Sequence, residues 1–563
     1  MKTPIWNNYN IGKIFKGDLI MVSYDKRWLK HYPKDVDANL EIKERSLSDL
    51  LNNAAKNFGE ATSLQFENDT WSFKDVQEIS ETLAGTLFQQ GFKKGDRLSI
   101  MLPNCAQYIF SLFATVRLGG IVVQTNPMYV ERELEYQLND TKAEFMICHD
   151  SLYYRVKRVQ DKTSLKKIIV VQFSDKKKIE LDVDDVFFDD FLDMYHSPPP
   201  EFKINPNEDI AVLQYTGGTT GKSKGVMLTH QNFINQTEQT YEFLFKRFDS
   251  KEGLNKVVIS FLPLFHIFGL ANVTLTGFLI GYKQIILPRF ETEPVLNIIK
   301  DDPPMFFFGV PTMFNAILNY PNIETFGINK IHGFFCGSSP MPLKTYNSFK
   351  ELINKTAFIS DGYGLSEMTS GTLSNPYTRM KVGSVGVPFP QTEAKIVVET
   401  DDGVEEAPIG TKGEIITRGP QLMKGYWNNQ EETKIAIRDG WLHTGDIGYM
   451  DEDGYFYIVD RKKDMIIASG FNVYPREVEE IIYQIPQVKE VIVIGAPDEH
   501  RGETVKAYIA LKENKEITEE EVIVFCREKL SAYKVPKLIE FRNELPKSSV
   551  GKLLKREIRN QEL

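Results

Sequence analysis

The sequence has 563 residues, too many for one hydrophobic core, so two or more domains are expected. Hydrophobic residues make up 42% and charged residues 26% of the chain, which is ordinary for a soluble globular protein. The net charge of −10 argues against nucleic acid as the main partner.

Four cysteines lie far apart in the sequence: Cys105, Cys148, Cys336 and Cys526. Their spacing fits neither a disulfide framework nor a zinc site and favours a reducing cytoplasm. The apolar stretches 108–123 and 271–287 contain Arg117 and Lys283. Both stretches predict buried elements, because a membrane span needs roughly 20 nearly uncharged residues. Residues 1–18 lack the apolar core of a secretory signal, and we treat residues 1–30 as a variable extension.

Helical and strand-like segments alternate along most of the chain, which is the pattern of an α/β protein. Apolar residues recur at helical spacing over 47–58, with Ser46 as the N-cap and Asp49 three residues later. Ser72 and Asp75 open a second helix in the same way. Short apolar runs predict buried strands at 98–102, 121–124 and 168–171.

A glycine-rich segment, YTGGTTGKSKG at 215–225, follows a strand-like run and precedes a predicted helix that starts at Thr229. Glycine lets backbone N–H groups approach phosphate oxygens, and the hydroxyls and lysines supply further donors and charge. The segment therefore predicts a phosphate-binding loop. The rival interpretation is a Walker P-loop, whose first glycine position is occupied here by Thr216. A flexible surface loop is the alternative without a binding function.

The pattern changes at the charged run DRKKD, residues 460–464. Beyond it, Pro475 starts a predicted helix, and apolar runs at 491–494 and 505–511 predict strands. Thr518 forms a capping box with Glu521 before another helix. These residues predict a small α/β domain joined to the rest of the chain by a charged hinge.

Nine further motifs follow the glycine-rich segment. They are PLFHIFG (263–269), GVPT (309–312), DGYGLSE (361–367), GSVG (383–386), GE with RG (413–419), GWLHTGD (440–446), DRKKD (460–464), SGF (469–471) and PKSSVGK (546–552). In this order they resemble the adenylate-forming enzymes, the superfamily of acyl-CoA synthetases, peptide-synthetase adenylation domains and luciferases. The resemblance covers roughly residue 30 to the C-terminus.

The resemblance implies both a fold and a reaction. It implies a mixed α/β fold with a large multi-subdomain N-terminal domain, 31–462, whose β-sheets are flanked by helices. A small mobile α/β domain, 463–563, follows a hinge at about Lys463. The implied reaction is ATP-dependent: a carboxylic acid first forms an acyl-adenylate, and coenzyme A then accepts the acyl group.

The resemblance also assigns the nucleotide site. The β- and γ-phosphates would be held by Thr216, Gly217, Gly218, Thr219, Thr220, Gly221, Lys222, Ser223 and Lys224. Further nucleotide contacts would come from Gly337, Ser338, Ser339, Asp361, Gly362, Tyr363, Gly364, Leu365 and Ser366. Thr216 and Glu367 would contact Mg²⁺. Asp446 would accept both ribose hydroxyls, which suits a carboxylate, with support from Arg461.

Lys552 is the residue predicted to drive the first step, bridging the substrate carboxylate and the α-phosphate as a compact point charge. His266 would border the same groups. On the sequence alone, a core histidine whose hydrogen bonds are satisfied within the protein is an equally good interpretation. In the second step the small domain would rotate about Lys463. This rotation would withdraw Lys552 and bring a coenzyme A surface inward, formed by Ser469, Gly470, Phe471, Lys534 and Arg501.

Several stretches resemble bacterial long-chain fatty-acid–CoA ligases: 119–127, 131–139, 418–427 and 440–463. The chain departs from the family pattern at Asp361, where glutamine is common, and at Ser338–Ser339, where a glycine/alanine pair is common. Leu270 stands where some long-chain enzymes have a gating tryptophan, which puts gated entry of a long acyl tail in doubt.

A long-chain fatty acid is therefore the expected substrate, alongside ATP and coenzyme A. A medium-chain or aromatic-acid CoA ligase, an enzyme that loads a carrier protein in trans and a non-catalytic nucleotide sensor remain open alternatives. We expect a cytoplasmic protein with peripheral contact to the inner face of the membrane. The sequence leaves monomer and homodimer open.

Overall fold

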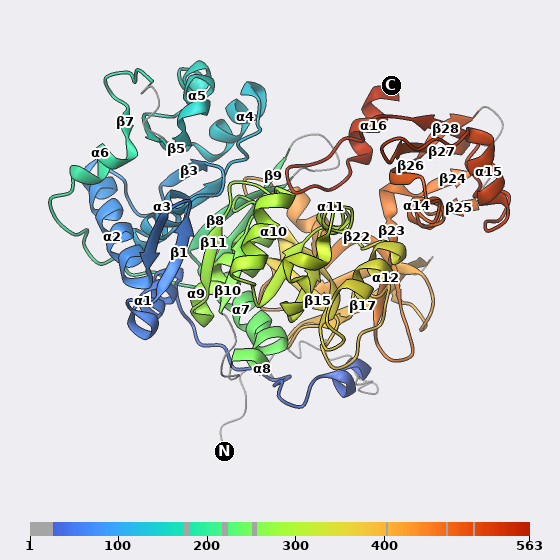
Figure 1. The fold of residues 1–563 in the computed structure, drawn as a ribbon. Helices are drawn as coiled ribbons and strands as arrows, with labels where there is room; N and C mark the ends of the chain where they lie inside the picture. Colours follow the sequence, from blue (N-terminus) through green and yellow to red (C-terminus); the bar gives the residue numbers. More distant parts are fainter. Residues whose placement is uncertain are drawn as a thin grey trace.

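The computed structural model describes residues 26–173, 179–216, 223–249, 256–400, 403–468, 471–498 and 502–562. Across these ranges the chain forms four β-sheets with helices packed around them (Figure 1). No helix in the described ranges is long and apolar enough to cross a membrane.

The first sheet has eight strands in the order β20-β9-β8-β4-β3-β5-β6-β7. The strands from β8 to β7 pair in parallel, whereas β9 pairs antiparallel with both β8 and β20. Their bounds are β3 (Arg97–Met101), β4 (Ile121–Gln124), β5 (Phe145–His149), β6 (Lys167–Val171), β7 (Val186–Phe187), β8 (Ile210–Thr216), β9 (Lys224–Thr229) and β20 (Gly425–Tyr426).

The second sheet has nine strands in the order β16-β15-β14-β13-β12-β10-β11-β1-β2. Their bounds are β1 (Thr62–Phe66), β2 (Asp69–Ser72), β10 (Val257–Ser260), β11 (Lys283–Ile286), β12 (Phe306–Gly309), β13 (Gly333–Cys336), β14 (Phe358–Leu365), β15 (Ser370–Ser374) and β16 (Val387–Pro388). Its central parallel strands are buried along their whole length, and β12 and β13 carry consecutive phenylalanines because both faces of the sheet are covered.

Helices surround these two sheets. They are α1 (Leu47–Phe58), α2 (Phe73–Gln89), α3 (Ala106–Arg117), α4 (Glu131–Thr141), α5 (Tyr153–Gln160), α6 (Phe188–Asp193), α7 (His230–Thr240), α8 (Lys246–Asp249), α9 (Thr276–Ile280), α10 (Thr292–Asp301), α11 (Pro311–Leu318) and α12 (Leu343–Leu352). Two π-helical segments, Tyr241–Phe245 and Phe268–Leu275, adjoin α7 and α9.

The third sheet has six strands and is antiparallel. It consists of β17 (Glu393–Thr400), β18 (Gly403–Glu406), β19 (Gly413–Arg418), β21 (Ile437–Arg438), β22 (Trp441–Met450) and β23 (Phe456–Arg461), with α13 (Gln430–Ala436) between β20 and β21. Strand β23 leads directly into the short 3-10 helix Lys462–Asp464, where the chain leaves this part of the molecule.

The last sheet belongs to a separate small unit, drawn in orange and red at one end of the molecule in Figure 1. Its elements are β24 (Ile466–Ala468), β25 (Phe471–Val473), α14 (Pro475–Ile482), β26 (Val488–Asp498), β27 (Gly502–Leu511), α15 (Glu519–Arg527), β28 (Leu538–Phe541) and α16 (Lys555–Glu562). It has its own apolar core, which includes Val478, Ile482, Val493 and Ile509. The small unit follows the charged run 460–464, and the domain boundary at about Lys463 stays a prediction.

Most predicted elements are confirmed within a residue or two. Both predicted capping boxes of the N-terminal region, Ser46 with Asp49 and Ser72 with Asp75, are present, and Thr518 caps α15 with Glu521. The apolar stretch 108–123 forms α3 and β4, and 271–287 forms part of a π-helix, α9 and β11. Arg117 and Lys283 are accommodated at the ends of these elements, where their charges form ion pairs with Glu81 and Asp302.

Candidate active site

An ion pair with a buried carboxylate lies at the centre of the predicted nucleotide site. Asp446 on β22 is only 3% exposed, and both of its carboxylate oxygens have partners. Arg461 at the end of β23 places its Nε 2.8 Å from Oδ1, and the Tyr363 hydroxyl donates to Oδ2 at 2.6 Å. The antiparallel register pairs Asp446 with Arg461 across β22 and β23, so the sheet itself sets this contact. The structure thus joins three residues that the sequence predicted for the nucleotide.

The predicted adenine-binding wall runs along β13 and β14. Gly337 follows β13, and an added Cβ there would lie 2.9 Å from the Phe268 ring, so only glycine fits. Ser338 adopts a positive φ of 63°, which turns the chain sharply before Ser339. On β14, a Cβ on Gly364 would lie 2.0 Å from the Ser370 carbonyl oxygen. The backbone geometry therefore explains the small residues at these positions.

Glu367 lies near the hairpin of β8 and β9, which carries the predicted phosphate loop. Gly362, Tyr363, Gly364 and Leu365 belong to β14, and Ser366 opens the 3-10 turn that presents Glu367. The Tyr426 hydroxyl donates to Glu367 Oε1 at 2.8 Å, while Lys224 Nζ lies 5.0 Å from the centre of the Tyr426 ring. Tyr426 therefore links the predicted metal contact to the predicted phosphate loop.

Of the predicted phosphate loop, the structure describes the two ends, where the loop joins β8 and β9. Thr216 ends β8 opposite Lys224 on β9, and Lys224 forms an ion pair with Glu432 of α13. The backbone carbonyl of Ser223 accepts a hydrogen bond from Tyr136. The remaining predicted residues, Gly217, Gly218, Thr219, Thr220, Gly221 and Lys222, lie outside the described residues.

The predicted magnesium contacts suit that ion. Glu367 keeps Oε2 available when Oε1 accepts from Tyr426, and Thr216 adds a hydroxyl. The described ranges contain no cluster of three or more His, Cys, Asp or Glu side chains that could hold a metal alone. Mg²⁺ is commonly held by one or two protein oxygens together with phosphate oxygens and water, so a sparse donor set fits.

Lys552 of the small unit reaches this site. Its ammonium is enclosed, and burial together with the nearby Arg461 cation lowers the pKa of Lys552 to about 8, against the opposing effect of Asp446 and Asp464. His266 faces the same ammonium, and burial with the Lys552 charge lowers the pKa of His266 to about 4. His266 is therefore neutral at physiological pH and acts as a hydrogen-bonding group.

A contact between the two parts of the molecule holds the Lys552 loop in place. Thr312, at the start of α11, donates from its hydroxyl to the Gly551 carbonyl oxygen at 3.3 Å. Gly551 has a φ of 77°, and an added Cβ would lie 2.9 Å from the Thr312 hydroxyl. Lys344 of α12 also donates to the carbonyl oxygens of Tyr483 and Ile485 at 3.4 Å each. The small unit is thus docked with Lys552 facing inward.

Two of the five residues predicted for coenzyme A, Lys534 and Phe471, lie in the described ranges. Lys534 forms an ion pair with Glu477 at 2.6 Å, and the backbone of Phe471 opens β25. Ser469, Gly470 and Arg501 lie outside the described residues. Lys463 lies within the 3-10 helix between β23 and β24, as a hinge position requires. These roles stay predictions.

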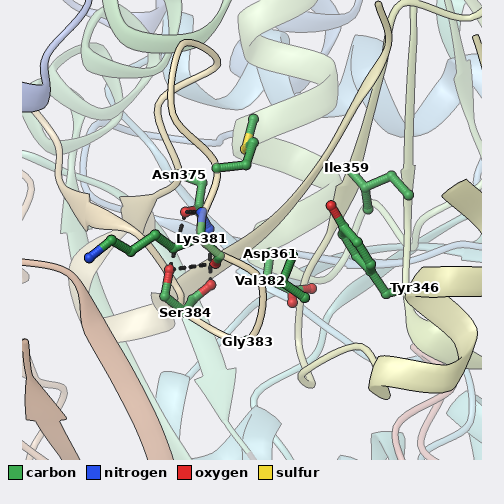
Figure 2. A pocket seen from close by; sticks show the side chains of 9 residues that line it. Tyr346, Ile359, Asp361, Asn375, Lys381, Val382, Gly383 and Ser384 are labelled. Carbon is green, nitrogen blue, oxygen red and sulfur yellow. Dashed lines mark hydrogen bonds between the residues drawn. The ribbon is translucent and has the colours of Figure 1, made fainter. Parts of the chain in front are cut away.

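Asp361 borders a small pocket beside the nucleotide wall (Figure 2). Across the pocket, Asn375 accepts from the Ser384 hydroxyl at 3.1 Å and donates to the Ser384 carbonyl oxygen at 2.9 Å. Asp361 Oδ1 is buried without a hydrogen-bond partner among the described residues. Burial raises the pKa of Asp361 to about 7, although the cation of Arg476 on α14 opposes this rise. The predicted nucleotide contact is therefore a carboxyl that is easily protonated.

Sequence reasoning missed Tyr426, Glu432 and Thr312 as contributors to the site. Tyr426 and Thr312 stand inside motifs that were recognised, yet their partners are 59 and 239 residues away in the sequence. Glu432 lies in the first turn of α13, where an acidic residue is ordinary. The motif positions of Tyr426 and Thr312 were the available signal; nothing marked Glu432.

This two-domain fold, with a lysine brought from the small part toward the Asp446–Arg461 ion pair in the large part, is typical of the class of adenylate-forming enzymes. Residues 51–427 match the family model described as "AMP-binding enzyme", and residues 477–552 match "AMP-binding enzyme C-terminal domain". The chain belongs to the AMP-binding enzyme family.

Similar proteins include a long-chain-fatty-acid–CoA ligase of Bacillus subtilis (strain 168), 41% identical with 95% of this chain and 98% of that protein covered. A probable 4-coumarate–CoA ligase 1 of Dictyostelium discoideum is 31% identical, with 86% and 89% covered. Among solved structures, the anthranilate CoA ligase AuaEII in complex with anthranoyl-AMP has a TM-score of 0.83, 26% identity and coverage of 93% and 99%. O-succinylbenzoate coenzyme A synthetase from Bacillus subtilis, in complex with ATP and magnesium ion, has a TM-score of 0.75, 28% identity and coverage of 91% and 99%.

The raised pKa of Asp361 predicts a pH-dependent effect of Asp361→Asn. Below about pH 4 the carboxyl is protonated in both the folded and unfolded chain. Between about pH 4 and 7 the unfolded chain loses this proton first, so the stability that the proton contributes is lost as pH rises. The melting temperature of Asp361→Asn relative to the unaltered protein should therefore be higher at pH 8 than at pH 5.

Asp451→Asn is the matched control. Burial opposes ionisation of Asp451, but the hydrogen bond from Lys381 prevails and lowers the pKa of Asp451. That carboxylate stays ionised from pH 5 to 8, so its substitution should shift the melting temperature equally at both values. An Asp361→Asn shift that does not depend on pH would contradict the titration assigned to Asp361.

Proposed function

We propose that this protein is an ATP-dependent fatty acyl-CoA ligase, with a long-chain fatty acid as its acid substrate. The observation that carries the proposal is the docking of the Lys552 loop on the large domain, where Thr312 donates to the Gly551 carbonyl oxygen and Lys552 comes within electrostatic range of His266, Asp446 and Arg461. The long-chain assignment is supported by the 41% identical Bacillus subtilis ligase.

In the first step, a carboxylate oxygen attacks the α-phosphorus of ATP. The bond between the α-phosphorus and the bridging oxygen breaks, and pyrophosphate leaves. Lys552 lies between the two anions and lowers their repulsion, which favours the transition state more than either separated reactant. Lys552, with a pKa of about 8, is mostly protonated at neutral pH, and the bound anions hold it in its charged form because nearby negative charge raises a lysine pKa.

The large domain orients the nucleotide for that attack. Tyr363 offers its ring as a flat apolar surface to the adenine, and Asp446 offers carboxylate oxygens to the ribose. The Tyr426 contact fixes Glu367 in the orientation that a metal contact needs. Magnesium, when bound, supplies positive charge to the phosphate oxygens. Thr216 and Glu367 are the residues that would hold it.

In the second step, the coenzyme A sulfur attacks the acyl carbonyl carbon. The bond from that carbon to the AMP oxygen breaks, the thiol proton passes to solvent, and AMP leaves. Lys552 occupies the approach to the carbonyl in the docked arrangement, so the small domain must move before the thiol enters. Lys463 lies in the short segment that connects β23 to β24, where the chain passes from the large domain to the small one. It is the proposed pivot.

An aromatic-acid or medium-chain CoA ligase is the second candidate. The 31% identical probable 4-coumarate–CoA ligase and the structural similarity to the anthranilate CoA ligase favour it. Leu270 at the start of the π-helix after His266 also differs from the gating tryptophan of some long-chain enzymes. The depth of the apolar acyl site decides between the candidates, since each buried methylene contributes about 0.8 kcal/mol.

The location proposed for the enzyme is the cytoplasm. All four cysteines are free and buried, which suits a reducing compartment. Peripheral membrane contact, which would give access to long-chain acids, and a monomeric or homodimeric state both stay proposals.

A substrate screen tests the proposed function. Pyrophosphate release is measured with fatty acids from acetate to arachidate and with aromatic acids, with and without coenzyme A. We expect kcat/KM to rise with chain length to a maximum among the long-chain acids, and acyl-CoA to form with AMP. A maximum with aromatic acids would select the second candidate, and no release with any acid would contradict a ligase.

Lys552→Ala separates the two half-reactions. Without the ammonium, ATP–pyrophosphate exchange should fall by at least about 100-fold, because a preorganised charge is lost at the transition state. Conversion of a supplied acyl-adenylate to acyl-CoA should stay within about threefold. Lys547→Ala, a lysine of the same loop that pairs with Glu490, is the control and should leave exchange intact. Equal loss of both half-reactions would contradict the assignment.

Lys463→Pro tests the pivot. Proline fixes φ near −65° and restricts the preceding residue, so rotation at this position is lost. Adenylate formation should persist, while steady-state acyl-CoA formation should fall by at least about tenfold. Retention of full ligase turnover would show that the chain does not pivot at Lys463.

A further inference from the structure

The last helix, α16, carries the loop that presents Lys552. The loop is tightly closed: Gly551 donates to the Ser548 carbonyl oxygen at 2.8 Å, and Ser548 donates to the Lys552 carbonyl oxygen at 2.8 Å. The Lys552 N–H also donates to the Ser548 hydroxyl at 3.2 Å. Helix α16 begins at Lys555, three residues further on. With so little freedom inside the loop, the position of α16 governs the position of Lys552.

Helix α16 is fastened to the segment that contains the proposed pivot. Arg559 Nη1 lies 2.6 Å from Asp464 Oδ1, and Asp464 is the residue after Lys463. Asp464 is 12% exposed, and Arg559 is 32% exposed. Burial alone would raise the pKa of Asp464, but the Arg559 hydrogen bond and charge outweigh it and lower that pKa. The ion pair is therefore shielded from solvent and holds Asp464 in its charged form.

Other contacts anchor α16 within the small domain. Lys555 pairs with Glu479 of α14 at 3.0 Å, and Ile558 is fully buried against the sheet. At the far end of the helix, Glu562 pairs with Lys506 of β27 at 2.9 Å. Of these contacts, the Arg559 ion pair is the one that joins α16 to the pivot segment, whereas Glu562, three residues further along the helix, joins it to β27.

We propose that Arg559, through its ion pair with Asp464, is a positioning residue for adenylate formation. It fixes the position of α16 relative to the pivot segment, so that docking brings Lys552 to His266 and Asp446 in register. This inference rests on the proposed role of Lys552. Because both partners lie C-terminal to Lys463, the ion pair travels with the small domain and does not select between its two arrangements.

The size of the effect follows from the geometry of the reaction. A misplacement of about 1 Å at a reacting group costs on the order of 100-fold in rate. Loss of the ion pair lets α16 tilt, and the rigid loop transmits the tilt to the ammonium. Thioester formation does not use Lys552, so the same loss leaves the second half-reaction intact.

Arg559→Met tests the proposal, because methionine keeps much of the apolar stem and removes the charge. We expect ATP–pyrophosphate exchange to fall by about 10- to 100-fold, mainly in kcat, with KM for ATP within about twofold. Thioester formation from a supplied acyl-adenylate should stay within about threefold. Arg559→Lys should restore most of the exchange, since it keeps a cation within reach of Asp464.

Glu562→Gln is the matched control, because it removes an ion pair that joins the same helix to β27 and not to the pivot segment. It should leave both half-reactions unchanged. Asp464→Asn should reproduce the Arg559→Met loss, and the double variant should be no worse than either single variant. Equal loss of both half-reactions in Arg559→Met, or recovery of exchange in the double variant, would overturn the positioning role.

The control for the underlying assignment is Lys552→Ala measured in parallel. If Lys552→Ala abolishes exchange and Arg559→Met does not, the positioning role fails while the proposed function stands. If Lys552→Ala retains exchange, the proposed role of Lys552 fails, and the positioning role fails with it.

Discussion

The contact between Asp446 and Arg461 is the interaction on which the site depends. The Asp446 carboxylate is shielded from water, and a buried charge is stable only when it is paired and its remaining hydrogen-bonding capacity is satisfied. Here the Tyr363 hydroxyl donates to the second carboxylate oxygen of Asp446. The ion pair is thereby also connected to β14, the strand that forms the predicted nucleotide wall. Arg461 is the last residue of β23, and the chain passes from it straight into the pivot segment. One buried pair thus orients the nucleotide site and the exit of the chain toward the small domain.

The same pair shapes the electrostatics that Lys552 meets. An enclosed lysine loses much of its preference for the charged form, and the Arg461 cation weakens that preference further. Asp446 and Asp464 act in the opposite direction. A lysine poised near neutrality gains the most interaction when two anions arrive, which is the situation that acid activation creates. The docked domain therefore supplies its charge at the point where repulsion between the substrates is greatest.

Local signals in the sequence predicted the elements and many site residues. The capping boxes at Ser46 and Ser72 place two helices because side chain and backbone satisfy each other within three residues. Asp446, Arg461 and Tyr363 were each assigned by motif, and the structure brings them together. Gly337 is explained by the close approach of the Phe268 ring and Gly364 by that of the Ser370 carbonyl oxygen, and no local pattern reveals either.

The contacts that sequence reasoning could not supply are those between distant segments. Tyr426 with Glu367, Thr312 with Gly551, and Arg559 with Asp464 join residues separated by 59, 239 and 95 positions. Each depends on how distant elements pack, within one domain or by docking of the small domain, and such packing is not encoded in a local run of residues. An arginine in a basic C-terminal helix looks like ordinary solvated charge until the fold places it beside the pivot.

The central claim is that the small domain delivers Lys552 for one step and withdraws it for the next. A distance measurement between spin labels at two exposed positions, Lys355 of the large domain and Lys515 of the small domain, tests it most directly. With ATP and a fatty acid, one distance should match the docked arrangement; with a stable acyl-adenylate analogue and coenzyme A, a second, clearly different distance should predominate. A single distance that is unchanged across all of these ligands would contradict the account.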